Sequence, residues 1–392
     1  MAIFVDLHAI QTVGPNNLNR GLDGSPKTAL FGGARRARVS SQALKRAMRT
    51  DFNEKYSPDN LGIRTKRIVK LLKDDIVRQS PDLEPEATEL AIAAFTAAGI
   101  KLEKPKVGKD QEIKDEDWVA NYLIFLSTAQ IEAAAEVAIK AYEEGGLEQL
   151  KTAAVKKALK AALNTDLSVD LALFGRMVAD DATLNVDASC QVAHALSTHP
   201  VETEFDFFTA VDDEKQRADE EDAGAGMMGN VEFGSSTLYR YATINATALT
   251  KQLGSTEAAV KAIEGFVDVF ATSLPTGKQN TFAAHSFPSA LVVSVRNDRP
   301  ASWVGAFERP VYPRKNADTP VEGYTTESAR RMFAHGAALD AAYGGPIEND
   351  VVLLTQDLNG VDVVLSDPDV VSSLQEIQEQ VGAAVQRHLE EA

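Results

Sequence analysis

The spacing of apolar residues changes twice along the chain, from a strand pattern to a helix pattern and back, and this restricts the folds that the chain can adopt. Residues 2–10 alternate, with Ile3, Val5 and Leu7 on one side and Asp6 and His8 on the other, and this pattern predicts a strand. From about 64 to 163 the apolar residues have helical spacing, and Gly145-Gly146 divides the Ala-rich end of this block into two helices. Strand-type sequence then returns. The order predicts an α+β fold in which a helical block interrupts an antiparallel sheet.

The second half of the chain alternates between strand and helix patterns. Four segments rich in β-branched and aromatic residues are predicted as strands, at 168–178, 188–198, 236–246 and 290–297. Helical spacing predicts helices at 255–274, at 325–343 with Thr326 as the cap, and near 368–390. We therefore expect a small antiparallel sheet with helices on one face.

Segment 201–235 lies between two predicted strands and is too polar to fill a core. It holds ten acidic residues between Glu202 and Asp222 and ends in a glycine-rich stretch. Such a segment predicts a long excursion from the sheet, mobile or ordered by a partner.

Composition excludes several classes of protein. The chain is 44% hydrophobic and 25% charged, which is ordinary for a globular protein and excludes general disorder. The one cysteine, Cys190, can form neither an internal disulfide nor a thiolate metal cluster, and it lies in an apolar strand pattern that predicts burial. We find no membrane-span pattern and no basic start typical of a signal peptide. The expectation is a cytoplasmic protein.

Charge is distributed unevenly along the chain. The formal net charge is −17, yet the residues through Lys73 include 14 basic and 5 acidic side chains. The densest stretch, Arg20 to Arg49, holds eight basic residues and one acid, Asp23. A local positive potential allows an acidic protein to bind a polyanion, although a basic run can equally be a solvated face.

The basic stretch has features of a phosphate-binding surface. Its sequence FGGARRARVSSQALKRAMR, residues 31–49, places two glycines and three arginines before a helix that Ser40 or Ser41 can cap. Loop amides freed by glycine and helix N-terminal amides can together bind an anion. Gln42, Lys45, Arg46 and Arg49 then lie on adjacent turns, so the donors continue along the helix. Because no aromatic residue interleaves them, the pattern indicates backbone binding with little base preference.

Other motifs give weak signals. GAGMMG at 224–229 matches a dinucleotide fingerprint, but it follows an acidic run and not a strand, so a flexible loop is the better interpretation. His194 and His199 are five residues apart, a spacing that points strand side chains to opposite faces and favours structural histidines over a metal pair. The sequence therefore predicts no metal site and no cofactor.

Six blocks in order resemble one known family. They are LNR at 18–20, FGGARRARVSSQALKRAMR at 31–49, DLALFGRM at 170–177, AHALSTH at 193–199, FFTAVDD at 207–213 and LYRYATIN at 238–245. Together they resemble CasC (Cse4-type), the backbone subunits of the type I-E CRISPR Cascade surveillance complex in the seventh Cas protein family. The blocks spread over about two-thirds of the chain.

The resemblance implies a fold shaped like a right hand. Its palm would be an RNA-recognition-motif-like (ferredoxin-like) sheet, formed by 1–60, the strand in 181–200, and 237–392 with the C-terminal helices. Residues 61–180 would form helical fingers, and 201–236 a thumb hairpin. Members of this family polymerise along a guide RNA into a helical filament, and each thumb flips out one nucleotide of that RNA. The invading DNA is then recognised by base pairing with the guide and not by the protein itself.

The resemblance also implies site residues. The family's guide-contacting basic positions match Arg20, Lys27, Lys45 and Arg49, with Ser40, Gln42 and Arg46 beside them. The family's methionine wedge matches Met177, although a core methionine is the plainer interpretation of that position alone. The implied partners are the CRISPR guide RNA, the target DNA strand, further copies of the chain, and the large, small and guide-end-capping Cascade subunits.

An enzyme is the alternative function. In type III relatives an aspartate after the first strand cuts target RNA, and here that loop holds Asp23. Phosphodiester cleavage needs a metal or a positioned base, and Asp23 has no neighbouring carboxylate in the sequence. We therefore expect an RNA-binding protein without enzymatic activity. A free-standing RNA-binding regulator is the third possibility.

Overall fold

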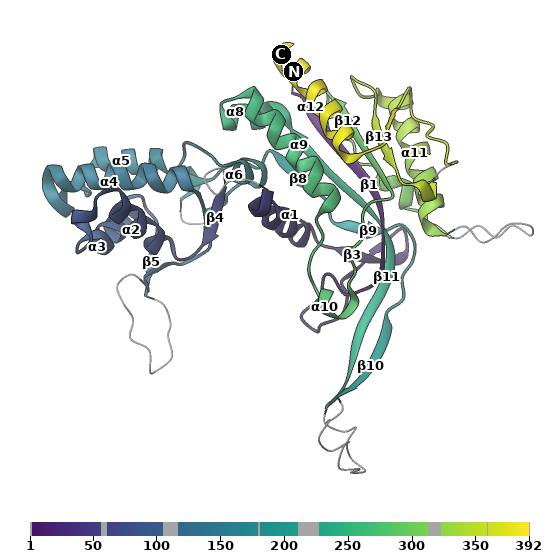
Figure 1. The fold of residues 1–392 in the computed structure, drawn as a ribbon, viewed down its shortest axis with the longest axis horizontal. Helices are drawn as coiled ribbons and strands as arrows, with labels where there is room; N and C mark the ends of the chain where they lie inside the picture. Colours follow the sequence, from purple (N-terminus) through teal and green to yellow (C-terminus); the bar gives the residue numbers. More distant parts are fainter. Residues whose placement is uncertain are drawn as a thin grey trace, which may run out of the picture. The chain divides into compact units, whose positions relative to one another are not determined.

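The computed structural model describes residues 2–55, 61–104, 117–178, 181–210, 227–312, 323–358 and 360–391. They fall into two compact units (Figure 1). Unit 1 comprises Met1–Asp51, Gln191–Ala246 and Ile263–Ala392, and unit 2 comprises Phe52–Cys190 and Thr247–Ala262. None of the helices in these ranges combines the length and hydropathy needed to span a membrane.

Unit 1 is built on a mostly antiparallel sheet. Its strands are β1 (Phe4–Asn16), β2 (Thr28–Phe31), β3 (Ala34–Val39), β9 (Ala195–Ser197), β10 (Glu204–Ala210), β11 (Met227–Asn245), β12 (Ala290–Arg296), β13 (Val351–Leu354) and β14 (Asp369–Val371). Within the described ranges they run in the order β14-β13-β12-β1-β11-β9-β3-β2, with β10 and β8 (Cys190–Val192) also paired to β11. β13 and β14 pair in parallel, whereas the neighbours along β13-β12-β1-β11-β9-β3-β2 pair antiparallel. The predicted α+β class with an antiparallel sheet is confirmed.

Helices cover both faces of this sheet, whereas we expected them on one face. One face packs on α11 (Tyr324–Tyr343), whose Met332 and Phe333 join Ile10 and Tyr239 in one apolar cluster. The opposite face meets α9 (Thr256–Thr272), since the guanidinium of Arg240 donates to the carbonyl of Phe270. The C-terminal helix α12 (Leu374–Glu391) packs on α9 and on β12 and β13. Figure 1 shows α11 and the α9–α12 pair on opposite sides of the sheet.

Burial of both faces explains why strand β1 is buried along Val5–Gln11 and not at alternate positions only. Val5 and Leu7 are fully buried on one face, and Asp6 and His8 are buried on the other. The polar residues there have partners: His8 Nδ1 lies 2.9 Å from the Tyr239 hydroxyl, and its ring stacks 3.8 Å from Trp303. The alternating sequence therefore predicted the strand correctly, but both of its faces are buried.

Strand β11 is 19 residues long and belongs to two structures at once. Its second half pairs with β1 from Ser236 to Asn245 in the sheet. Its first half pairs with β10, from Glu204↔Phe233 to Ala210↔Met227, as a two-stranded hairpin that projects from the sheet in Figure 1. This hairpin lies inside the segment predicted as an excursion, whose acidic run at 211–226 is outside the described residues.

Unit 2 is mainly helical. Its helices are α2 (Ile68–Gln79), α3 (Ala87–Ala97), α4 (Thr128–Gln149), α5 (Ala153–Ala162), α6 (Val169–Phe174) and α8 (Ala246–Leu253), with short pairs β4 (Gly62–Thr65) with β7 (Ile124–Ser127) and β5 (Leu102–Glu103) with β6 (Val119–Ala120). Three-residue 3-10 turns at Pro81–Leu83 and Ala182–Leu184 complete it. The predicted break is confirmed, because Gly145 and Gly146 have non-helical backbone angles inside α4.

Two local predictions were wrong. Segment 168–178 is not a strand, because Val169–Phe174 forms helix α6 and positive-φ Gly175 ends it. Thr326 does not cap α11, since that helix begins at Tyr324 with Gly323 at the cap position. Apolar residues in short runs fit both strand and buried helix, which explains the first error.

Unit 1 also contains short helical elements next to its strands. They are the 3-10 turns Val304–Phe307 and Gln356–Leu358 and the one-turn helix α10 (Gln279–Phe282).

Candidate nucleic-acid interface

The hairpin β2–β3 forms the first part of the basic stretch. Gly32 and Gly33 turn it with positive φ angles of 57° and 74°, and a Cβ on Gly32 would lie 1.6 Å from the carbonyl oxygen of Glu308. The paired glycines therefore form a tight turn that packs against the backbone of Glu308, and the expected binding of an anion by their amides stays a prediction.

Arg36 is fully buried, and this corrects the view of the three arginines as one exposed cluster. Its guanidinium donates to the carbonyl oxygens of Ser197 and Phe307, each at 2.9 Å, and at longer range to those of Phe31 and Glu308. Burial lowers the pKa of Arg36. Arg36 thus joins three backbone segments and is inaccessible to a polyanion.

Loop residues before the hairpin hold Arg20 and Lys27 in place. The backbone N–H of Lys27 donates to Asn19 O at 2.8 Å, and Asn19 Oδ1 accepts from the N–H of Ser40 at 2.9 Å. Asp23, in the same loop, accepts from the Ser25 N–H at 3.1 Å and so stabilises a turn. The loop is therefore tied directly to the start of helix α1 (Ser41–Lys55).

The start of α1 is capped by side chains, as predicted for Ser40. The Ser40 hydroxyl accepts from the Ala43 N–H at 3.4 Å, and His194 Nδ1 accepts from the Ser41 N–H at 3.2 Å. These two amides therefore already have acceptors and are not open to an anion. Ser40 itself is 5% exposed, so its proposed RNA contact remains a prediction and its observed role is that of a cap.

His194 was expected to be structural, and its position supports this. Burial, together with nearby Arg38 and Lys27, lowers the pKa of His194. The neutral ring can accept at Nδ1 and so complete the cap on α1. His199 is also structural: its Nε2 accepts from the Thr237 N–H at 3.1 Å and its ring stacks on Tyr324.

Helix α1 has three faces. Leu44 and Met48 are buried on the inner one. At 100° per residue, Gln42, Lys45 and Arg49 share an outward face, as the stripe pattern predicted. Arg46 lies at the border between this stripe and a third face.

The third face of α1 lines an open hollow of about 710 Å³. Arg46 and Thr50 come from the helix, Arg20 from the preceding loop, and Gly277 and Lys278 from a segment more than 200 residues later. Sequence analysis missed Lys278, because nothing in its local pattern connects it to the basic stretch. The hollow gathers three basic side chains around one surface.

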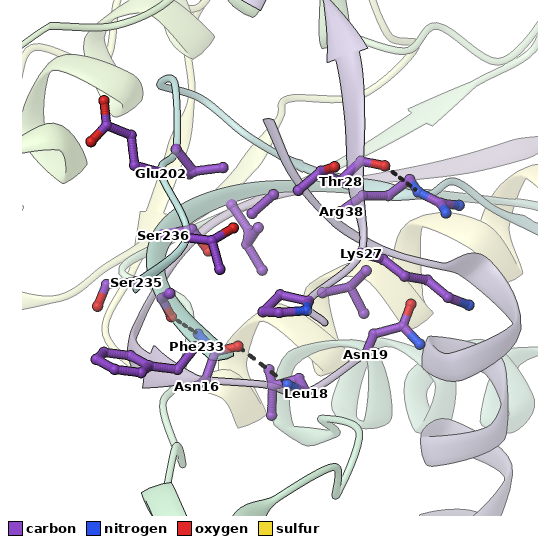
Figure 2. Close-up of a pocket in the computed structure, with 17 residues that line it drawn as sticks. Asn16, Leu18, Asn19, Lys27, Thr28, Arg38, Glu202, Phe233, Ser235 and Ser236 are labelled. Atoms are coloured by element: carbon purple, nitrogen blue, oxygen red, sulfur yellow. Dashed lines mark hydrogen bonds between the residues drawn. The ribbon is translucent and has the colours of Figure 1, made fainter. Parts of the chain in front are cut away.

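A smaller pocket of about 40 Å³, with room for no more than a few waters, lies beside this surface. Figure 2 shows Lys27, Arg38 and Asn19 on one side of it and Glu202 on the other. Arg38 is held there by its Nε, which donates to Thr28 O at 3.4 Å. Lys27 and Arg38 therefore extend the basic surface of unit 1.

Met177 lies in unit 2 and is 83% exposed, which argues against the core interpretation. Its neighbours fix it on both sides. The Val178 N–H donates to Asn185 Oδ1 at 2.6 Å, and the buried Arg176 donates to the carbonyl oxygens of Leu184 and Leu163, each at 2.7 Å. Burial lowers the pKa of Arg176 to about 10. Met177 is therefore an exposed side chain between two hydrogen-bonded neighbours, and its role as a wedge stays a prediction.

The hairpin β10–β11 exposes apolar side chains that the sequence analysis did not assign to the site. Register places Phe205, Phe207 and Met228 on one face, where they are 63–66% exposed. Phe208 lies on the other face, over Gly229, where a Cβ would come within 2.8 Å of its ring. Aromatic and thioether surfaces of this kind can stack on bases.

Metal-site geometry is not present in the described ranges, where no group of three or more His, Cys, Asp or Glu side chains could hold an ion. The gathered features are therefore an extended basic surface, an exposed methionine and an exposed aromatic hairpin face.

Comparisons with known proteins agree on one family. The sequence model of the CT1975-like protein family matches residues 5–379. A chain of a solved "CRISPR RNA-guided surveillance complex, pre-nicking" is 30% identical, with a TM-score of 0.80, over 97% of this chain and all of that one. A chain of another "CRISPR RNA-guided surveillance complex" is 25% identical, with a TM-score of 0.69, over 97% of this chain and 99% of that one. Among curated proteins, none matches.

Proposed function

Because the chain belongs to the CT1975-like protein family, we propose that it is a guide-RNA-binding subunit of a CRISPR Cascade surveillance complex. The structures similar to it over nearly their whole lengths are chains of such complexes. The observation that carries the proposal is the basic surface of unit 1, formed by Arg20, Lys27, Lys45, Arg46 and Arg49 with Lys278 beside them.

This surface suits the sugar-phosphate backbone better than bases. Lysine and arginine supply charge and multiple donors for phosphate, and phosphate contacts carry no sequence information. Such a protein binds any guide sequence, and specificity comes from pairing between guide and target. The function is thus antiviral defence in which the protein holds the guide and the guide selects the invading DNA.

The finer features are also proposals. Unit 2 corresponds to the fingers, the hairpin β10–β11 to the thumb, and the sheet of unit 1 to an RNA-recognition-motif-like palm of the type I-E backbone. Repeated copies would form a helical filament on the RNA in the cytoplasm, in contact with the target DNA strand and the other Cascade subunits. Met177 would insert beside a flipped nucleotide, since its exposed, rigidly held side chain needs no hydrogen bond there.

We propose further that the chain is not a nuclease. Asp23 stabilises a turn through Ser25 and is exposed in a loop, which supports a structural role. Hydrolysis of a phosphodiester needs a metal or a positioned base beside the carboxylate.

Coexpression with a repeat-derived RNA tests the proposal. The purified protein should retain the RNA, protect it from ribonuclease and form rods whose length follows the RNA. Guides of unrelated sequence should bind equally well. A protein that elutes free of RNA, and that binds no guide at low salt, would refute the assignment.

A further inference from the structure

Loop 276–289 connects α9 to β12 and contains the one-turn helix α10, which Figure 1 shows next to the strands of unit 1. Strand β12 pairs with β1 only from Phe4 to Ile10. Beyond Ile10 the loop follows β1 instead: Ser289 N–H donates to Ile10 O at 2.8 Å, and Gln11 Nε2 donates to Ser286 O at 2.7 Å. The loop therefore covers the part of β1 beyond Ile10, with which β12 does not pair.

Buried groups hold this loop at both ends. Gln11 is fully buried, and its Oε1 accepts from the guanidinium of Arg240, which is 1% exposed. At the other end Gly277 approaches Leu18 so closely that a Cβ would lie 2.4 Å from the Leu18 carbonyl oxygen. Contacts of this kind fix the backbone, so the loop presents its side chains in a defined arrangement.

Two non-glycine residues in the loop adopt the left-handed conformation. Lys278 has φ 55° and Ala283 has φ 46°, and they flank α10. Non-glycine residues in this region cost conformational energy and persist where the surroundings impose them. The contacts of Gln11 with Ser286 and of Gly277 with Leu18 offset this conformational cost. They thereby fix the position of Lys278 in the basic hollow.

The exposed side chains of the loop suit a nucleic acid. Phe287 is 71% exposed, although its neighbour Ser286 is anchored to Gln11. The 29 residues 269–297 contain no Asp or Glu, in a chain that has 57 of them among 392 residues. Lys278 adds a positive charge beside Arg20 and Arg46. Asp51 also lines the hollow, so three basic side chains meet one acid there. An acid-free loop with an exposed phenyl ring, beside a hollow with this net positive charge, fits a base and a phosphate better than an acidic partner.

We propose that loop 276–289 is a second RNA contact, in which Lys278 pairs with a phosphate and Phe287 stacks on a base. This inference rests on the proposed function, since the RNA is the one that the basic surface binds. It adds an aromatic contact to a surface whose α1 stripe has none. Because stacking is tolerant of base identity, the contact remains compatible with guides of any sequence.

The two side chains should have different signatures in RNA binding. Phe287→Ala should weaken binding of a single-stranded RNA about tenfold at every salt concentration, because stacking releases no counterions. Lys278→Ala should reduce the slope of log affinity against log salt by about 0.7. Phe287→Trp should retain affinity, and RNA should quench its emission beyond any quenching seen in wild type, whose two native tryptophans are the buried Trp303 and the half-buried Trp118. Tyr343→Ala, at another exposed aromatic in unit 1, should change nothing.

Outcomes separate this inference from the proposed function. If wild-type protein binds no RNA, the proposed function fails. If wild type binds and Phe287→Ala binds equally, with the Phe287→Trp emission unquenched, only the loop contact is overturned. If Phe287→Ala loses affinity for a long RNA but not for an RNA that binds only one protein molecule, Phe287 contacts a neighbouring protein molecule. This result would also overturn the proposed loop contact. Circular dichroism should show every variant folded.

Discussion

Strand β3 and helix α1 follow each other in the chain and are both rich in basic residues, yet they use them differently. In β3 the alternation of the strand turns Arg36 inward, where it donates only to backbone carbonyl oxygens. In α1 the helical period keeps Leu44 and Met48 inside and directs Lys45 and Arg49 outward. The comparison teaches that a count of basic residues in a sequence overstates the charge that a ligand can meet.

Arg36 is one of several buried arginines that donate to backbone carbonyl oxygens. Arg176 does the same in unit 2, and Arg240 does it beneath the ring of Phe270. Arg36 and Arg176 each satisfy several backbone acceptors that would otherwise lack a donor, whereas Arg240 satisfies the carbonyl of Phe270 and Oε1 of Gln11. Such arginines are structural, and the following experiments separate them from the exposed ones.

The largest effect is expected from Arg36→Met. The substitution leaves the buried carbonyl oxygens of Ser197 and Phe307 without a hydrogen-bond donor, which costs about 1–3 kcal/mol each. The free energy of unfolding should therefore fall by about 4 kcal/mol. Arg35→Met, at the exposed neighbouring position, is the matched control and should change stability by less than about 0.5 kcal/mol. Denaturant unfolding measures both. Equal losses would remove the distinction between the two positions.

The contribution of the buried carboxyl of Asp350 to stability should depend on pH. Burial is the main cause that raises the pKa of Asp350 to about 6, reinforced by Asp340 and Asp6 and opposed by Ser294 and Arg296. The folded state therefore binds this proton more tightly than the unfolded state, so the contribution of Asp350 to stability should fall as pH rises from about 4 to about 6, by up to about 3 kcal/mol.

Asp350→Asn removes this titration and tests it. The difference in unfolding free energy between Asp350→Asn and wild type should shift with pH across that window and level off above it. Asp369→Asn, at an exposed site, is the control that should show no such shift. A pH-independent difference for Asp350→Asn would contradict the expectation.

The stripe on α1, in which Lys45 and Arg49 are half-buried, should act on RNA binding. Lys45→Ala with Arg49→Ala should lower the salt slope of single-strand RNA binding by about 1.4 and weaken binding for any sequence. Because alanine is the better helix former, the helix should persist. Lys140→Ala with Arg387→Ala removes the same charge elsewhere and should leave the slope nearly unchanged. An unaltered slope in the stripe variant would make the stripe a solvated face.

A smaller effect on stability is expected at Met177. Since its side chain is 83% exposed, Met177→Ala should change the free energy of unfolding by less than about 0.5 kcal/mol, while it alters guide geometry or target capture. Met332→Ala, at a fully buried methionine, should cost about 2–5 kcal/mol. Thermal unfolding of the free protein compares the two. A large loss at Met177 would restore the core interpretation.

The smallest effect is expected from Asp23→Asn. Assembled protein incubated with complementary RNA and Mg²⁺ should leave the RNA intact, before and after the substitution. Cleavage by wild type that Asp23→Asn abolishes would make the chain a nuclease.

Much of the local structure was predictable from the sequence because short-range signals decided it. Ser40 capping α1, the break at Gly145 and Gly146, and the first strand follow from caps, glycine and periodicity. The burial of Arg36 did not follow, since it depends on carbonyl oxygens supplied by residues near 197 and 307. Lys278 was missed for the same reason: only the tertiary fold brings it to Arg20. The predicted guide contacts themselves still await their test.

Strand β11 has a consequence for how chains of this kind can diverge. It is continuous from the hairpin into the sheet, so successive side chains from Met228 to Asn245 point to opposite faces of the strand. A single inserted or deleted residue near Gly234 would turn the aromatic face of the hairpin to the opposite side while the sheet kept its register. Length changes within this strand are therefore tolerable only in pairs, unless a bulge absorbs the odd residue.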